Sequence, residues 1–134
     1  MFEKIDHIGI AVKDLEQSLR FYRDQLGLEL KDIEEVDEQK VKVAFVPVSE
    51  SNLELLEPTD PSGPVGKFLA KKGEGFHHIS FSVSNLEDKL KQLQEQGVEL
   101  IDNEPRYGAG GAKIAFIHPR STGGILIELC EHCT

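Results

Sequence analysis

The sequence is poor in features that mark several classes of protein. Fifteen lysines and arginines are outnumbered by twenty-four aspartates and glutamates, which gives a formal net charge of −9. This charge repels polyanions, so we expect neither nucleic acid nor an acidic membrane surface as a partner. No apolar run is long enough to cross a bilayer, and no basic stretch followed by an apolar one opens the chain. These absences favour a cytoplasmic protein.

Cysteine is also scarce. Only Cys130 and Cys133 occur, both in the segment "ELCEHCT". A single C-x-x-C pair is a weak indication of zinc because a closed structural site has four ligands, although His132 would supply a third. The spacing favours a frayed, reduced C-terminal segment, with a metal or redox role as the alternative.

What the chain does contain is an internal duplication. The segment "DHIGIAVKDLEQSL" (residues 6–19) aligns with "HHISFSVSNLEDKL" (residues 77–90), and "KVAFV" later aligns with "KIAFI" at the same offset. The 134 residues therefore predict one domain over residues 1–134, built from two copies of one unit. We expect module one at about residues 1–60, a connector at 61–74 with a short helix at 65–72, and module two at 75–134.

Each module shows the pattern of a strand, a helix and three further strands. Asp14 and Asn85 are plausible N-caps for the two helices. Their apolar stripes have helical spacing and are expected at Leu15, Leu19, Tyr22 and Leu26 in the first copy and at Leu86, Leu90 and Leu93 in the second. The second strand of module two is expected at "VELI". The pattern predicts an α+β fold of two tandem βαβββ modules that form a cupped mixed sheet.

Two histidines and two glutamates occupy equivalent positions in the copies. Strand alternation places His7 and His78 on the face of their strands away from the aliphatic side chains that should face the helices. Small residues beside each histidine leave room for a ligand. Glu54 and Glu128 each lie between two aliphatic residues on a later strand. A buried, ionised carboxylate needs a partner. Two imidazoles and two carboxylates suit one divalent metal ion with positions left for substrate.

The whole chain resembles the vicinal oxygen chelate superfamily, whose paired βαβββ modules hold a metal. That family's ligand pattern falls here on His7, Glu54, His78 and Glu128. Within it the sequence is most similar to the methylmalonyl-CoA epimerase family, on the strength of "DHIGIAVKDLEQSLRFY" and "EPRYGAGGAKIAFIHPRSTGGILIEL". Extradiol dioxygenases of the superfamily use one carboxylate rather than two, so Glu54 disfavours that class.

The resemblance implies epimerisation of methylmalonyl-CoA between its 2R and 2S forms, by removal of the α-proton through a metal-stabilised enolate. It implies Co²⁺ as the ion, although Mn²⁺, Ni²⁺ or Zn²⁺ would also suit the ligands. It further implies a small acyl-CoA as substrate and a homodimer.

The acid/base pair of such an enzyme is expected to be Glu128 and Glu54. Some epimerases carry a further glutamate on the second strand of module one, where this sequence has Val43. The basic side chains available to CoA phosphates are Arg106, Lys113 and Arg120. The alternatives are a lactoylglutathione lyase of the glyoxalase I type, with the same four ligands, and a non-catalytic binding protein of the bleomycin-resistance type.

Overall fold

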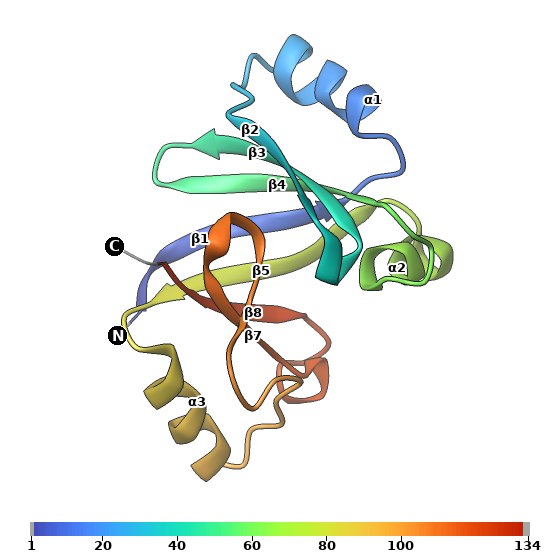
Figure 1. Ribbon diagram of the computed structural model, residues 1–134. Helices are drawn as coiled ribbons and strands as arrows, with labels where there is room; N and C mark the ends of the chain where they lie inside the picture. The colour runs from blue at the N-terminus through green and yellow to red at the C-terminus, as the bar shows by residue number, and fades with distance from the viewer. Residues whose placement is uncertain (1, 133–134) are drawn as a thin grey trace. The chain divides into compact units, whose positions relative to one another are not determined.

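A computed structural model describes residues 2–132 (Figure 1). Its contacts divide into two compact units, an N-terminal unit of His7–His77 and a C-terminal unit that joins residues 2–6 to residues 78–132. Strand β1 (Phe2–Ala11) begins in the C-terminal unit, and β5 (Gly75–Val83) begins in the N-terminal unit. No helix in the described part of the chain is both long and apolar enough to span a membrane.

The N-terminal unit has four strands in the order β2-β3-β4-β1. They are β2 (Asp32–Val36), β3 (Val41–Val48), β4 (Ser51–Pro58) and the second half of β1. The β2–β3 and β3–β4 pairs are antiparallel, and β1 pairs with β4 in parallel.

The C-terminal unit repeats this topology in the order β6-β7-β8-β5. Its strands are β6 (Arg106–Tyr107), β7 (Lys113–Ile117), β8 (Ile127–Glu131) and β5. The β6–β7 and β7–β8 pairs are antiparallel, and β5 pairs with β8 in parallel. The matching orders confirm the α+β class and the duplicated βαβββ pattern.

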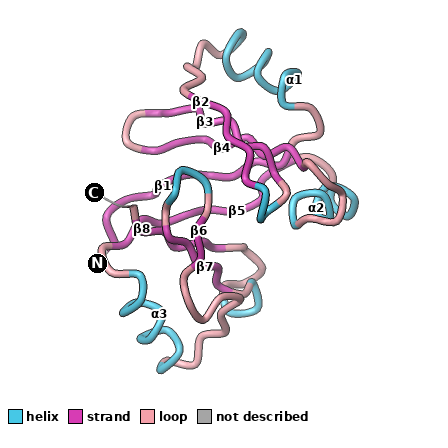
Figure 2. The backbone as a smooth tube through the Cα atoms, in the orientation of Figure 1, coloured by secondary structure: helices cyan, strands magenta, loops and turns pink. Residues whose placement is uncertain are grey.

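In each unit the helix that follows the first strand packs on the sheet (Figure 2), and in the N-terminal unit the helix of the connector also contacts β4. Helix α1 (Leu15–Leu19) packs on β4, and α3 (Leu86–Glu95) packs on β8. The predicted N-caps are confirmed, since Asp14 accepts a hydrogen bond from the Gln17 backbone N–H and Asn85 accepts one from that of Asp88. The connector carries α2 (Pro64–Lys72), close to the helix expected at 65–72.

The core of each unit lies between its helix and its sheet. In the N-terminal unit this core is formed by Val12, Leu15, Leu19, Ala44, Val46 and Leu55. In the C-terminal unit it is formed by Val83, Leu86, Leu90, Ala115, Ile117 and Leu129. Equivalent strands thus bury one set of alternate side chains beneath the helix and turn the other set to the opposite face of the sheet.

Two details of the predicted elements are wrong. Leu26 does not belong to the core stripe and is 55% exposed, because the chain after Leu19 widens into a π-helical segment (Arg20–Gln25) that moves later side chains off the α-helical face. Leu28 packs on the core instead. In module two the expected strand "VELI" is reduced to one bridge between Leu100 and Ile117, and the paired strand there is β6.

Candidate functional site

A buried histidine–glutamate pair lies in the N-terminal unit, on the face of its sheet away from α1. Glu54 is opposite Gly9 in the β1–β4 register, so no side chain separates it from the neighbouring strand. His7 Nδ1 lies 3.2 Å from Glu54 Oε2. The two residues are 5% and 7% exposed, respectively. The expected pairing of an imidazole with a carboxylate is therefore present within this unit.

The C-terminal unit contains the equivalent pair. His78 Nε2 lies 3.4 Å from Glu128 Oε1, and both side chains are buried. The edge of the His78 ring meets the Phe116 ring, with centroids 5.8 Å apart. Ser80, opposite Glu128 in the β5–β8 register, is fully buried, and its hydroxyl donates a hydrogen bond of 3.0 Å to Glu128 Oε2. Ser80 thus orients the carboxylate so that its other oxygen faces His78.

Both pairs have distances that suit metal ligands. Nitrogen and oxygen ligands at about 2.1 Å from one ion, separated by a tetrahedral angle, are about 3.4 Å apart. The His7–Glu54 separation of 3.2 Å and the His78–Glu128 separation of 3.4 Å are therefore each compatible with two ligands on the same ion. The donor atoms, imidazole nitrogen and carboxylate oxygen, are those that divalent transition metals take.

Val43 lies on the face of β3 that carries the pair in its unit. It is opposite Leu56, next to the Phe45–Glu54 register position, and is 1% exposed. An apolar, fully buried side chain at this position supplies no proton acceptor. Any acid/base chemistry on this face therefore depends on other groups.

The basic residues expected near CoA phosphates all have acidic neighbours. Lys113 Nζ lies 3.5 Å from Glu87 Oε1, and this hydrogen bond raises the pKa of Lys113. Arg106 Nε lies 3.4 Å from Asp102 Oδ1, and Arg120 Nη1 lies 3.4 Å from a carboxylate oxygen of Glu99.

An open depression of about 530 Å³ in the C-terminal unit is lined by Arg106 and Lys113. Side chains of α3, among them Leu90, also line it, so it lies on the helix-covered side of the sheet. Glu128 is on the opposite face, and this depression is not the histidine–glutamate site.

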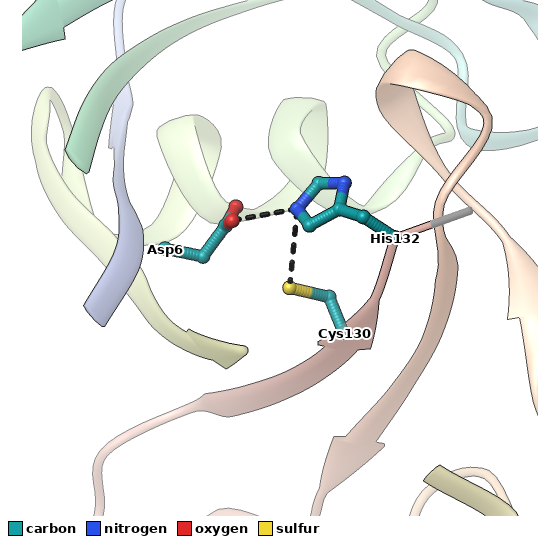
Figure 3. Close-up of side chains that lie close together, drawn as sticks. All are labelled: Asp6, Cys130 and His132. Atoms are coloured by element: carbon teal, nitrogen blue, oxygen red, sulfur yellow. Dashed lines mark hydrogen bonds and ion pairs between the residues drawn. The ribbon is translucent and has the colours of Figure 1, made fainter. Parts of the chain in front are cut away.

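A third cluster, shown in Figure 3, contains Cys130 and His132, which the sequence offered as possible metal ligands, and Asp6, which sequence reasoning missed. His132 Nε2 lies 2.6 Å from Asp6 Oδ1 and 3.8 Å from Cys130 Sγ. The expectation of a frayed tail is wrong for Cys130, which lies within β8 and is 1% exposed, while Cys133 lies outside the described residues. Burial raises the pKa of the Cys130 thiol to about 12. The sequence did contain one indication that Cys130 lies on the same face of the sheet as Glu128, because the two residues are two positions apart on one strand.

The sequence matches the model of a known protein family over most of its length. The model of the Glyoxalase/Bleomycin resistance/Dioxygenase superfamily matches residues 6–116. The chain belongs to this superfamily. The matched region includes His7, Glu54 and His78 and ends before Glu128.

Three relatives illustrate the similarity. The uncharacterized protein YqjC of Bacillus subtilis is 51% identical, over 96% of this chain and 91% of its own. The ethylmalonyl-CoA/methylmalonyl-CoA epimerase of Cereibacter sphaeroides is 34% identical, over 96% of this chain and 98% of its own. The structure of a Streptomyces coelicolor methylmalonyl-CoA epimerase variant with 2-nitronate-propionyl-CoA superposes with a TM-score of 0.94, at 39% identity over 100% of this chain and 97% of that one. The expected kinship with methylmalonyl-CoA epimerases is confirmed.

Proposed function

We propose that this protein is a methylmalonyl-CoA epimerase, which interconverts the 2R and 2S forms of its substrate. The observation that carries the proposal is the repeated, buried histidine–glutamate pair, one in each unit of a chain that matches epimerases over nearly its full length. Each buried carboxylate has a histidine as its partner, which keeps both donor types beside one another in each unit.

We further propose that His7, Glu54, His78 and Glu128 together hold one divalent cation, with Co²⁺ as the expected ion. The support is that each pair is buried and has the spacing of two ligands on one ion. When bound, the cation would stabilise the negative charge that develops on the thioester oxygen as the α-proton leaves.

Glu128 and Glu54 are the proposed acid/base groups. Inversion of the α-carbon requires that a proton leave from one face and another return to the opposite face, which two carboxylates on equivalent strands would achieve. In one direction the α-C–H bond breaks, the proton goes to one carboxylate, and the electron pair stays with the substrate. The other carboxylate, already protonated, then donates to the α-carbon. Ser80 holds the Glu128 carboxylate in place through a hydrogen bond to Oε2.

The test follows the α-hydrogen of methylmalonyl-CoA in D₂O by NMR. The parent protein should exchange it and convert one epimer to the other, a chelator should stop both processes, and Co²⁺ should restore them. Glu54→Gln and Glu128→Gln keep an oxygen that a cation can bind but cannot accept a proton, so each should lose epimerisation while retaining Co²⁺. Each should still exchange the α-hydrogen of the one epimer that the remaining carboxylate can deprotonate. Glu35→Gln, at an exposed position on β2, is the matched control and should behave as the parent.

Retained epimerisation in both glutamine variants would refute the acid/base assignment. Activity on a hemithioacetal of glutathione, with none on methylmalonyl-CoA, would instead identify a lactoylglutathione lyase. Absence of both activities from metal-loaded protein would favour the bleomycin-resistance type of binding protein. The predicted homodimer is tested separately by light scattering.

A further inference from the structure

The cluster of Asp6, Cys130 and His132 has no part in the proposed reaction, yet its three side chains converge on one point. Each offers one ligand atom, a carboxylate oxygen, a sulfur and an imidazole nitrogen, and all three atoms lie within 4.8 Å of one another. Figure 3 shows Nε2 of His132 directed at both the Asp6 carboxylate and the Cys130 sulfur. A salt bridge alone would need only Asp6 and His132.

We propose that Asp6, Cys130 and His132 form a second metal site, suited to a borderline-soft divalent cation such as Zn²⁺. Thiolate and imidazole ligands favour zinc over the hard cations Mg²⁺ and Ca²⁺, and one carboxylate completes a mixed set of three. On binding, the cation takes the place of the thiol proton, which is released to the buffer.

The distances are close to those of such a site. A tetrahedral zinc with Zn–N near 2.0 Å and Zn–S near 2.3 Å holds the nitrogen and sulfur about 3.6 Å apart. The observed separation between His132 Nε2 and Cys130 Sγ is 3.8 Å. The separation of 2.6 Å between His132 Nε2 and Asp6 Oδ1 is that of a direct hydrogen bond. It would open by about 0.7 Å, to the roughly 3.3 Å expected between nitrogen and oxygen ligands of one ion.

The surroundings provide both support and access. Asp6 is 5% exposed and Cys130 is 1% exposed, so their positions are fixed by packing; Cys130 belongs to an apolar cluster with Ala112 and Ile114. The His132 side chain is 48% exposed. A cation can therefore reach the cluster from solvent and keep a fourth position for water.

Cobalt is the probe, because a bond between Co²⁺ and a thiolate gives a charge-transfer absorption in the near ultraviolet that nitrogen and oxygen ligands do not give. Metal-free, full-length protein is titrated with Co²⁺ under reducing conditions. The parent should develop this absorption and saturate at no more than two ions per chain, since the histidine–glutamate site also takes Co²⁺, and Zn²⁺ should abolish it by displacement. None of the four proposed catalytic-site ligands contains sulfur, so this signal succeeds or fails independently of the proposed function.

The variants assign the ligands. Cys130→Ser should abolish the absorption. His132→Gln, at a half-exposed position, should weaken Co²⁺ binding at this site at least about tenfold, since loss of outer-shell groups alone costs that much. The control, Cys133→Ser, should keep the parent signal. An absent signal in the parent, a signal that survives Cys130→Ser, or unchanged affinity in His132→Gln would overturn the proposal.

Discussion

Replacement of Ser80 by alanine tests whether the orientation of Glu128 matters for catalysis. The Ser80 hydroxyl is fully buried and donates to Glu128 Oε2 at 3.0 Å. A hydrogen bond to an ionised group contributes about 1.5–3 kcal/mol. At 1.36 kcal/mol per tenfold in rate, its loss should lower the kcat for epimerisation by roughly 10- to 150-fold. Because the hydroxyl acts through Glu128, KM should change little.

Ser82 provides the matched control for this experiment. It lies on the same face of β5, is 3% exposed, and donates to a different carboxylate, Glu3 Oε1, at 2.8 Å. Ser82→Ala should therefore lower the melting temperature by a few degrees, as Ser80→Ala does, but leave kcat near the parent value. The kcat from steady-state kinetics and the melting temperature from thermal unfolding are measured for both variants. Equal kcat in Ser80→Ala and the parent, or an equal loss in Ser82→Ala, would show that Ser80 has no positioning role.

Three further predictions concern stability. Leu19→Ala, at a fully buried position, should lower the free energy of unfolding by about 2–5 kcal/mol in urea titrations, whereas Leu26→Ala, at a position 55% exposed, should lower it by less than about 1 kcal/mol. Gly27 has a φ of 83° with open space around it, so Gly27→Ala should cost about 1–2 kcal/mol through backbone strain alone; a neutral result would contradict the left-handed conformation. Burial raises the folded-state pKa of Cys130 to about 12 from 9.0. The protonated thiol therefore contributes fully to the free energy of unfolding below pH 9, and this contribution is lost as the pH rises from 9 to 12. With a chelator present, the free energy of unfolding of the parent should fall by up to about 1.4 kcal/mol per pH unit more than that of Cys130→Ala across this range. Parallel plots of unfolding free energy against pH for the two proteins would refute the raised pKa.

The duplication made much of the structure predictable. Once "DHIGIAV" and "HHISFSV" are aligned, alternation alone assigns His7 and His78 to the face away from the helices, and the buried pairs with Glu54 and Glu128 confirm that assignment within each unit. The capping residues were predictable for the same reason, since they act within one turn of chain. Periodicity and caps are local properties that a single sequence displays.

The failures arose where the two copies diverge or where contacts are distant in sequence. The π-helical segment after Leu19 has no counterpart in the second helix, so a regular helical period misplaced Leu26. Strand β6 follows a loop of different length from that before β2, and its pairing with β7 depends on that loop. Asp6 and His132 are separated by nearly the whole chain, and no spacing rule connects them.

Strand β8 shows why core and site depend on one register. Leu129 belongs to the core beneath α3, whereas Glu128 and Cys130 project from the other face. Glu128 is held between two cross-strand neighbours, Ser80 on β5 and Phe116 on β7. A shift of one residue would turn the carboxylate into the core and bring Leu129 to the site, because alternate residues exchange faces. Burying that unpaired charge costs several kcal/mol, so the apolar pattern that folds the strand also fixes the face on which the Glu128 carboxylate lies.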